Sequence, residues 1–338
     1  MPNRFCFGLF CFCLAFMVGT VVSSHTSEGQ GSKTIVFLGD SITEAGAAPN
    51  GYVTLLGESL QKHFPDVGYK VVGAGISGNR VPDIQARLDR DVLVHKPDVV
   101  VIYIGINDVW HSQSGQGTSE ADFEAGLHDV IKRIRAAGSK VLLCTPSMIG
   151  EKTDGSNSLD EMLESYSGIS RKVARETGVA LFDLRKSFVR ELKIRNPDGK
   201  ESGVLTSDGV HLNTAGNQFL CDCLRPWVHS VTTGNCIRHI VLFKFQETAT
   251  AADINYIADE FARLKEKIEF MQEFEAGIDI SPENLNQGYT HAFVATFPDA
   301  AARDAYLVHQ AHKDFVSILS PHLDSALVID FLGKGKCP

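Results

Sequence analysis

The sequence Gly39-Asp40-Ser41 follows directly after the apolar run Thr34–Leu38. An apolar run of this length is typical of a buried parallel strand, and open α/β folds keep their active sites at the carboxyl ends of such strands. The hydroxyl of Ser41 therefore lies where a catalytic nucleophile is needed. Asp40 is expected to hold the turn beside Ser41 without taking part in the chemistry.

A histidine and a carboxylate that could activate this serine occur together in the segment Ser207–Asn213. His211 has a side chain whose ordinary pKa lies close to neutral pH, so it can act as a general base. Asp208, three residues earlier, can fix the tautomer of that imidazole. We predict Ser41 as nucleophile, His211 as base and Asp208 as its supporting acid. The structural alternative for Asp208 and His211 is a turn at the start of the next helix.

Two further segments could supply N–H donors to a developing oxyanion. Gly78 lies in Gly75–Arg80, after the apolar run Tyr69–Gly73, where a glycine lets the backbone approach a substrate closely. Asn107 follows the apolar run Asp98–Gly105 and can point its amide toward the same edge of a sheet. With the Ser41 backbone N–H, these groups would form an oxyanion hole, in which one donor is typically worth about 100- to 1,000-fold in turnover. Taken singly, Gly78 could serve a tight turn and Asn107 a helix cap.

A parallel sheet would bring these residues together. Between residues 33 and 229, short apolar runs alternate five times with stretches of helical spacing, which predicts a five-stranded parallel sheet covered by helices on both faces. The runs are Thr34–Leu38, Tyr69–Gly73, Asp98–Gly105, Val141–Thr145 and Val179–Leu184. Two polar stretches, His111–Ser119 and Gly150–Ser158, are expected to form mobile loops near the site.

The four polar segments, in this order, resemble the motifs of the SGNH/GDSL hydrolase family. The resemblance covers residues 33–229 and implies a three-layer, flavodoxin-like α/β fold with serine esterase activity. It also implies catalytic roles for Ser41, Asp208 and His211, and an oxyanion hole built from Ser41, Gly78 and Asn107. No cofactor is expected, and the scattered histidines predict no metal site.

A second unit follows the polar stretch 230–236, which is expected to be a linker. Residues 237–332 show the order strand, helix, strand, strand, helix, strand, which predicts a ferredoxin-like α+β fold. The expected strands are Ile237–Phe245, Met271–Ile280, Tyr289–Phe297 and Ala326–Phe331, and the expected helices are Ala251–Phe270 and Ala300–Leu319.

This second unit resembles the stress-responsive dimeric α/β-barrel family through Arg238–Phe245, Gly288–His291, Tyr306–His312 and Val328–Phe331. The resemblance implies a homodimer formed through this domain, because a sheet with helices on one face must bury its other apolar face. Some family members are polyketide cyclases with a tyrosine and a histidine spaced as Tyr306 and His312 are. A second site at these two residues is therefore an alternative to a purely assembling or ligand-capturing role.

The first 24 residues have the layout of a cleaved secretory signal peptide, with Arg4, the apolar stretch Phe5–Val22 and small residues after it. This predicts a secreted or periplasmic protein; an uncleaved N-terminal anchor is the alternative. Five cysteines follow the signal peptide, and an odd number cannot all pair. Because the first and last strands of a ferredoxin-like unit are neighbours, Cys236 and Cys337 are predicted to form a disulfide.

The formal charge of −9 argues against a nucleic acid or an anionic membrane surface as the main partner. We expect a small-molecule or glycan ester as substrate, with short O-acyl groups on carbohydrates favoured, and no stable membrane insertion after signal cleavage. A lysophospholipid or longer acyl ester is the alternative within this class. A non-catalytic glycan- or lipid-binding module with a dimerising barrel domain is the alternative outside it.

Overall fold

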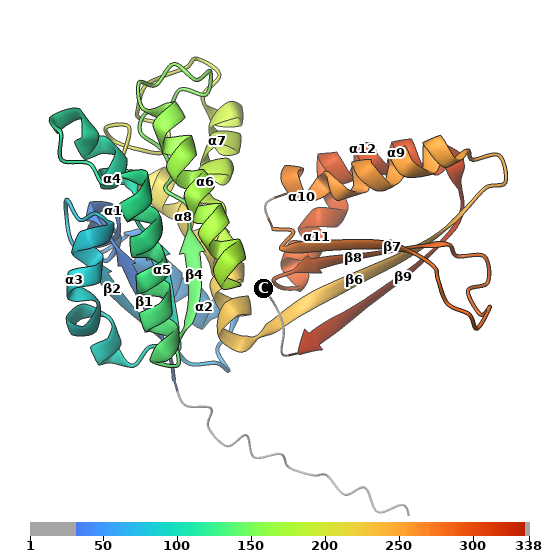
Figure 1. Cartoon of the computed structure of the whole chain (residues 1–338), viewed down its shortest axis with the longest axis horizontal. Coiled ribbons are helices and arrows are strands. Elements are labelled where there is room, and N and C mark those ends of the chain that lie inside the picture. The colour runs from blue at the N-terminus through green and yellow to red at the C-terminus, as the bar shows by residue number, and fades with distance from the viewer. Residues whose placement is uncertain (1–31, 269, 335–338) are drawn as a thin grey trace, which may run out of the picture. The chain divides into compact units, whose positions relative to one another are not determined.

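The computed structural model describes residues 32–268 and 270–334 (Figure 1). The expected signal peptide and Cys337 lie outside the described residues. The first part of the chain forms a five-stranded parallel sheet in the order β2-β1-β3-β4-β5, which confirms the predicted fold. Its strands are β1 (Lys33–Gly39), β2 (Tyr69–Gly75), β3 (Val99–Tyr103), β4 (Lys140–Cys144) and β5 (Ala180–Phe182).

Helices cover both faces of this sheet, as Figure 1 shows. Helices α3, α5 and α6 pack side by side, and α2 packs against α8. Every residue of the central strand β3 is buried, in keeping with its unbroken apolar sequence. The helices are α1 (Ser41–Gly46), α2 (Tyr52–His63), α3 (Val81–Asp91), α4 (Ile106–Trp110), α5 (Glu120–Ala136), α6 (Asp160–Thr177), α7 (Leu184–Arg195) and α8 (Thr214–Thr233), with short 3₁₀ turns η1 (Leu93–His95) and η2 (His111–Ser114).

The strand order places the predicted site residues at one edge of the sheet. Strand β1 lies between β2 and β3, so the segments that follow these three strands leave the sheet as neighbours. Ser41 begins α1 after β1, Gly78 lies in the loop after β2, and Asn107 lies in α4 after β3. Parallel strands present their carboxyl ends at the same edge, which is how the sheet gathers these segments.

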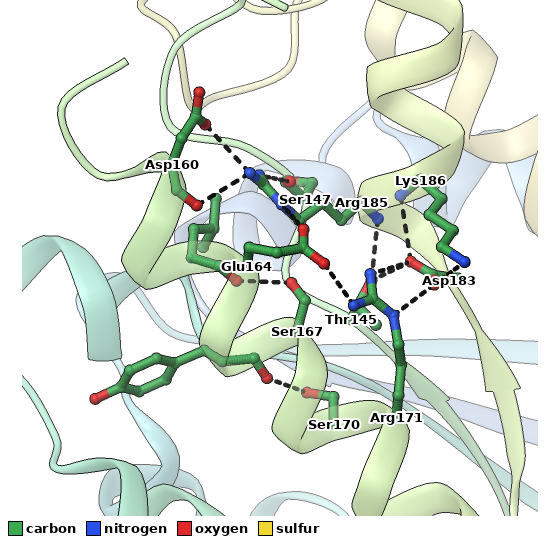
Figure 2. Close-up of polar contacts among 12 residues, drawn as sticks. Thr145, Ser147, Asp160, Glu164, Ser167, Ser170, Arg171, Asp183, Arg185 and Lys186 are labelled. Carbon is green, nitrogen blue, oxygen red and sulfur yellow. Dashed lines mark hydrogen bonds and ion pairs between the residues drawn. The ribbon is translucent and has the colours of Figure 1, made fainter. Parts of the chain in front are cut away.

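A network of charged side chains around the buried Arg185 holds the segment that leaves β4 (Figure 2). The Arg185 side chain, only 8% exposed, donates to the carbonyl oxygen of Ser147 at 3.2 Å and pairs with Asp160 and Glu164. Arg171 pairs with the other oxygen of Glu164. A buried charge such as that of Arg185 is tolerated when it is paired and hydrogen-bonded, as this one is. The network therefore fixes the backbone after β4 against α6 and α7.

The second part of the chain has the predicted ferredoxin-like topology. Its antiparallel sheet has the order β7-β8-β6-β9, so the first and last strands are neighbours as expected. Helices lie on one face of this sheet (Figure 1). The strands are β6 (Asn235–Phe245), β7 (Glu273–Ile278), β8 (His291–Phe297) and β9 (Leu323–Lys334), and the helices are α9 (Ala251–Ala262), α10 (Leu264–Lys267), α11 (Ala300–Val308), α12 (Gln310–Leu319) and the 3₁₀ turn η3 (Ser320–His322).

Both helices expected in this part are divided in the structure. The first is interrupted at Arg263 and the second at His309, whose backbone is extended. The His309 ring accepts the Ala311 N–H at 3.1 Å and so caps the start of α12. The prediction of one continuous helix over residues 300–319 is therefore wrong, because this side chain starts a new helix without any glycine or proline.

The stretch 230–236 does not form the separate linker expected between the two parts of the chain. Helix α8 continues through Pro226 to Thr233 and ends at Gly234, which has a left-handed backbone with φ of 70°. Strand β6 begins at the next residue, so a single glycine joins helix and strand. Cys236 is disulfide-bonded and buried, whereas Cys144 and Cys221 are free thiols. Within residues 32–268 and 270–334, no helix is long and apolar enough to span a bilayer.

Candidate active site

The structure brings Ser41, His211 and Asp208 into direct contact. The Ser41 Oγ atom lies 2.9 Å from His211 Nε2, and the other ring nitrogen, Nδ1, lies 2.7 Å from Asp208 Oδ2. With Asp208 ionised, Nδ1 donates its proton and Nε2 is free to accept the proton of the Ser41 hydroxyl. This chain of two hydrogen bonds is the geometry that serine activation requires.

Local backbone contacts place each of these three side chains. Ser41 is the first residue of α1, and the buried Asp40 caps this helix by accepting the Ile42 N–H at 3.0 Å. This agrees with the structural role expected for Asp40. Asp208 Oδ1 accepts the N–H groups of Val210 at 3.0 Å and His211 at 2.8 Å, which folds the loop around the carboxylate.

Asp208 remains a carboxylate at neutral pH. Partial burial acts to raise its pKa, but the hydrogen bonds from the His211 ring and from the two backbone N–H groups outweigh burial and lower the pKa below its ordinary value. An ionised Asp208 accepts a hydrogen bond from the His211 Nδ1–H group, which leaves the lone pair on Nε2 facing Ser41. The charge of Asp208 thus sets the orientation of the predicted base.

Gly78 and Asn107 border the same cavity as Ser41 and His211. Gly78 has a φ of 77°, a conformation that favours glycine, and this turns the loop after β2 toward Ser41. Asn107 is buried, and its Nδ2 atom donates to the carbonyl oxygen of Asn79 at 3.1 Å. All five residues predicted from the sequence are therefore collected at one place, although their catalytic roles stay predictions.

The cavity has a volume of about 550 Å³ and is bordered mainly by residues of the α4–η2 segment: Trp110, His111, Gln113 and Ser114, with Ser77 on the opposite loop. The Trp110 ring lies 6.4 Å from the His211 ring, centre to centre. The sequence indicated a loop here but did not single out Trp110 or Ser77. Trp110 comes three residues after Asn107, a helical spacing that would place both on one face of α4.

A carboxylate outside the motifs holds the loop of Gly78. Glu44 Oε2 accepts the Ser77 N–H at 2.9 Å and also the Ser77 hydroxyl. Glu44 lies one helical turn after Ser41 on α1, so this contact ties the helix of the nucleophile to the predicted oxyanion loop. No motif pointed to Glu44, because its partner is 33 residues away.

The second predicted pair also meets in the structure. Tyr306 on α11 and His312 on α12 have ring centres 4.3 Å apart, and the buried His239 ring lies 5.6 Å from Tyr306. Tyr306 is 1% exposed, and burial raises the pKa of its phenol above the ordinary range. The break at His309 brings the two rings together. Their use in catalysis stays a prediction.

Three ligand-type side chains also gather away from the cavity. The atoms of Glu124 and His128 on α5 and Glu176 on α6 lie within 4.8 Å of one another. His128 Nε2 is 3.1 Å from Glu176 Oε2, and Lys172 pairs with Glu124. These contacts are those of a solvated ion-pair cluster between two helices, and the cluster shares no residue with the cavity beside Ser41.

The fold and the site define a serine ester hydrolase with a flavodoxin-like α/β domain. Residues 37–219 match the GDSL-like lipase/acylhydrolase family, and the chain belongs to this family. Residues 237–332 match the stress responsive A/B barrel domain. Both matches confirm the resemblances seen in the sequence.

Individual relatives agree with these assignments. An acetylxylan esterase of Geobacillus stearothermophilus is 33% identical over 209 residues, covering 57% of this chain and 91% of the esterase. The crystal structure of an acetyl xylan esterase, AlAXEase, has a TM-score of 0.55 and 45% identity, covering 58% of this chain and 98% of that one. The stress-response A/B barrel domain-containing protein HS1 of Arabidopsis thaliana is 39% identical over 95 residues, 28% of this chain and 87% of HS1.

Proposed function

We propose that this protein is an exported esterase that removes short O-acyl groups, acetyl above all, from carbohydrates, with Ser41 as nucleophile. The observation that carries this proposal is the hydrogen-bonded chain from Ser41 Oγ through His211 to Asp208, at 2.9 and 2.7 Å, opening into a cavity bordered by Gly78 and Asn107. It is the arrangement of acyl transfer by a serine nucleophile.

The reaction proceeds in two halves. His211 Nε2 takes the hydroxyl proton of Ser41 as Oγ attacks the ester carbonyl, and the N–H groups of Ser41, Gly78 and Asn107 stabilise the oxyanion. The C–O bond to the alcohol then breaks, and His211 returns the proton to the leaving alcohol. In the second half, water gives a proton to His211 and attacks the acyl-enzyme. The bond between the acyl carbon and Ser41 Oγ then breaks, His211 returns its proton to Oγ, and the carboxylic acid leaves.

Support for a carbohydrate ester comes from the relatives and from the cavity. The two acetylxylan esterases named above match the hydrolase part over nearly their full lengths. The polar side chains of Ser77 and His111 can hydrogen-bond a hydroxylated alcohol, and the Trp110 ring offers a flat apolar surface to a sugar or a small acyl group. A longer acyl ester is the alternative that the same experiment decides.

Export is supported by two features. The first 24 residues have the composition of a cleaved signal peptide. Cys236 is disulfide-bonded, and disulfides persist mainly in oxidising compartments outside the cytosol. N-terminal sequencing of protein collected from the medium tests export and cleavage. The mature chain should begin after the small residues near position 24. Protein that stays in the membrane with an intact N-terminus would contradict it.

The second domain is proposed to make the protein a homodimer. One face of its sheet carries the helices, and the other presents apolar side chains. Residues opposite one another in antiparallel strands share a face. Ile240 opposes Ile329 and Leu242 opposes Leu327. Leu327, Ile329 and Phe331 are 39 to 50% exposed. A second copy of this face would bury these side chains by twofold symmetry.

The experiment for the hydrolase site compares the mature protein with its Ser41→Ala variant on p-nitrophenyl esters from acetyl to dodecanoyl, and on acetylated xylo-oligosaccharides with release of acetate as the signal. Ser114→Ala is the matched control, because Ser114 borders the same cavity but does not contact His211. We expect the highest activity on acetyl esters, a loss of at least about 10,000-fold in Ser41→Ala, and little change in Ser114→Ala.

Other outcomes separate the alternatives. Activity that rises with acyl length and depends on Ser41 would replace the carbohydrate ester by a lipid ester. Glycan binding by Ser41→Ala with no hydrolysis by the parent would favour a binding module. Hydrolysis that survives in Ser41→Ala would remove Ser41 from the mechanism.

A further inference from the structure

Glu151 is a fully buried carboxylate in the segment between β4 and α6, and it does not border the cavity beside Ser41. Its Oε1 atom accepts the N–H groups of Leu205 at 2.7 Å and Thr206 at 2.5 Å, and the Thr206 hydroxyl at 2.7 Å. Its Oε2 atom accepts the N–H of Val204 at 2.8 Å. All four donors belong to residues 204–206, directly before the loop that carries Asp208 and His211.

Thr206 connects Glu151 to this loop. The Thr206 hydroxyl donates to Glu151 and accepts the Gly209 N–H at 3.0 Å. Thr206 also pairs with Leu212 in an isolated antiparallel bridge, and the Ser207 N–H donates to the His211 carbonyl oxygen at 2.8 Å. Residues 206 to 212 are thus closed at their base, and this base is bound to Glu151.

The backbone beside Glu151 also contacts the loop of Asp208 and His211 directly. The Gly150 N–H donates to the Gly209 carbonyl oxygen at 2.8 Å. Gly209 has a φ of 92°, and a Cβ atom there would lie 3.3 Å from Gly150 Cα, so glycine suits this contact. The supporting segment is itself held: Asn196 Nδ2 donates to the Glu151 carbonyl oxygen at 2.9 Å, and Arg185 fixes Ser147 upstream (Figure 2).

Stability alone does not account for a carboxylate at this place. Burying a charge costs free energy that hydrogen bonds offset only in part, and apolar replacements of buried charges are often neutral or stabilising. Four directional hydrogen bonds donated to one carboxylate do, however, define the position of residues 204–206 more narrowly than apolar packing would. They therefore also define the position of the loop that follows residue 206.

We infer that Glu151 is a positioning residue for ester hydrolysis: through residues 204–206 it holds the loop of Asp208 and His211 so that His211 Nε2 stays within hydrogen-bond reach of Ser41 Oγ. The inference rests on the proposed catalytic roles of Ser41 and His211. Because Glu151 does not border the cavity, it affects turnover and not substrate binding. A displacement of about 1 Å at a catalytic group can cost about 100-fold in rate.

The test is Glu151→Gln, which keeps the size of the side chain but replaces one acceptor oxygen by an NH₂ group that meets a backbone donor. We expect kcat on p-nitrophenyl acetate to fall about 30- to 100-fold, with KM within about twofold of the parent value. The proton on His211 Nδ1, observed by NMR in protein labelled with ¹⁵N-histidine, should shift or broaden because its contact with Asp208 is less fixed.

A second variant and a control complete the experiment. Thr206→Val removes the hydroxyl between Glu151 and Gly209, and should give the same changes at smaller size. Asp98→Asn is the matched control: Asp98 accepts the Thr34 N–H at 2.8 Å at the amino end of the sheet, so the same change from acid to amide occurs far from the histidine loop. Its kcat should stay within about twofold of the parent.

Three results would overturn the inference. The first is a folded Glu151→Gln protein with the parent kcat and an unchanged His211 signal. The second is an equal loss of kcat in Asp98→Asn, which would show general destabilisation. If Glu151→Gln does not fold, an unchanged kcat in Thr206→Val is the third. Hydrolysis that survives Ser41→Ala is a separate result, because it removes the proposed function itself.

Discussion

The side-chain Nδ2 atom of Asn107 donates a hydrogen bond to the backbone carbonyl oxygen of Asn79 at 3.1 Å. Asn79 directly follows Gly78, so this bond joins the segments that leave β2 and β3, the two strands on either side of β1. An amide group has two N–H donors. One is used to hold the Gly78 loop, and the other is the one available to an oxyanion.

Asn107→Ala should therefore impair hydrolysis in two ways, by removing an oxyanion donor and by releasing the Gly78 loop. We expect kcat to fall about 100- to 1,000-fold while KM changes little, because the donor acts mainly in the transition state. Gln113→Ala is the control, since Gln113 borders the same cavity without contacting Asn79. Equal kcat values for Asn107→Ala and the parent would exclude Asn107 from the oxyanion hole.

Arg87→Lys should reduce turnover although Arg87 does not border the cavity. The Arg87 side chain, 6% exposed, donates to the Gly39 carbonyl oxygen at 2.8 Å and to Asn79 Oδ1 at 2.6 Å. A lysine ammonium cannot span both acceptors as a guanidinium does. We expect a loss of about tenfold in kcat. Arg90→Lys on the same helix, at an exposed position, should have no effect; equal losses in both variants would contradict this role.

Ile329→Lys should convert a dimer to monomers. Ile329 opposes Ile240 on the open face of the second sheet, whereas its neighbour Val328 opposes the buried Val241 on the helix face. Val328→Lys is therefore a control of nearly equal exposure on the other side of β9. Analytical ultracentrifugation should find a dimer for the parent and for Val328→Lys, and a monomer for Ile329→Lys. A monomeric parent at micromolar concentration would refute dimerisation through this face.

The sequence was sufficient to predict the sheet and the site segments, because the signals for both are local. Short apolar runs marked the strands, and the polar residues directly after them marked the edge where the site lies. The expected run Val141–Thr145 differs by one residue from β4, and Tyr69–Gly73 falls two residues short of the end of β2. Differences of this size are those of fraying strand ends, and they do not move Ser41 or Asn107.

Glu151 could not be found from local signals. It lies in the polar stretch Gly150–Ser158, which predicted a mobile loop near the site, yet its side chain is fully buried. The residues that bind it are 53 to 55 positions away in the chain. This glutamate is buried because the backbone N–H groups of residues 204–206 bind its carboxylate. Only the tertiary fold brings these groups to the segment that carries it.

The break at His309 was missed for a similar reason. Residues 300–319 have continuous helical spacing with no glycine or proline, so nothing in their pattern ends a helix. The side chain of His309 ends it by accepting the Ala311 N–H, a role more often filled by serine or aspartate. The break places the rings of Tyr306 and His312 in contact, a pairing that a continuous helix would not have suggested.

The second domain should lose stability in acid because of His239. Burial, together with the charge of Arg303, lowers the pKa of His239 to about 4. In the unfolded chain the pKa is near 6.5, so the unfolded state binds more protons, and stability falls as pH decreases from 6.5 to 4. The loss is about 2 to 3 kcal/mol.

Hydrogen exchange of the β6 and β8 amides measures this effect in the second domain directly. His239→Gln keeps a donor for Asp330, whose Oδ1 lies 2.7 Å from Nδ1 in the parent, but it does not titrate. Its exchange rates should depend less on pH between 6.5 and 4. The same pH dependence in parent and variant would show that another group is responsible.

Asp40→Asn should stabilise the hydrolase domain in alkaline solution. Burial raises the pKa of Asp40 to about 7, against the opposing effect of the Ile42 N–H, and Asp40 Oδ2 has no hydrogen-bond partner among the described residues. The native state therefore retains a proton that the unfolded chain loses near pH 3.8. The stability associated with this proton is complete below pH 3.8 and is lost as pH rises to about 7.

An asparagine keeps the oxygen that accepts the Ile42 N–H and cannot ionise. The advantage of Asp40→Asn over the parent in free energy of unfolding should therefore grow by about 2 to 3 kcal/mol between pH 5 and pH 9. Both tryptophans, Trp110 and Trp227, lie in the hydrolase domain, so their fluorescence in urea follows this domain alone. The exposed Asp66→Asn is the control, with a difference that stays constant. An advantage that does not grow with pH would mean that Asp40 is ionised in the folded protein throughout this range.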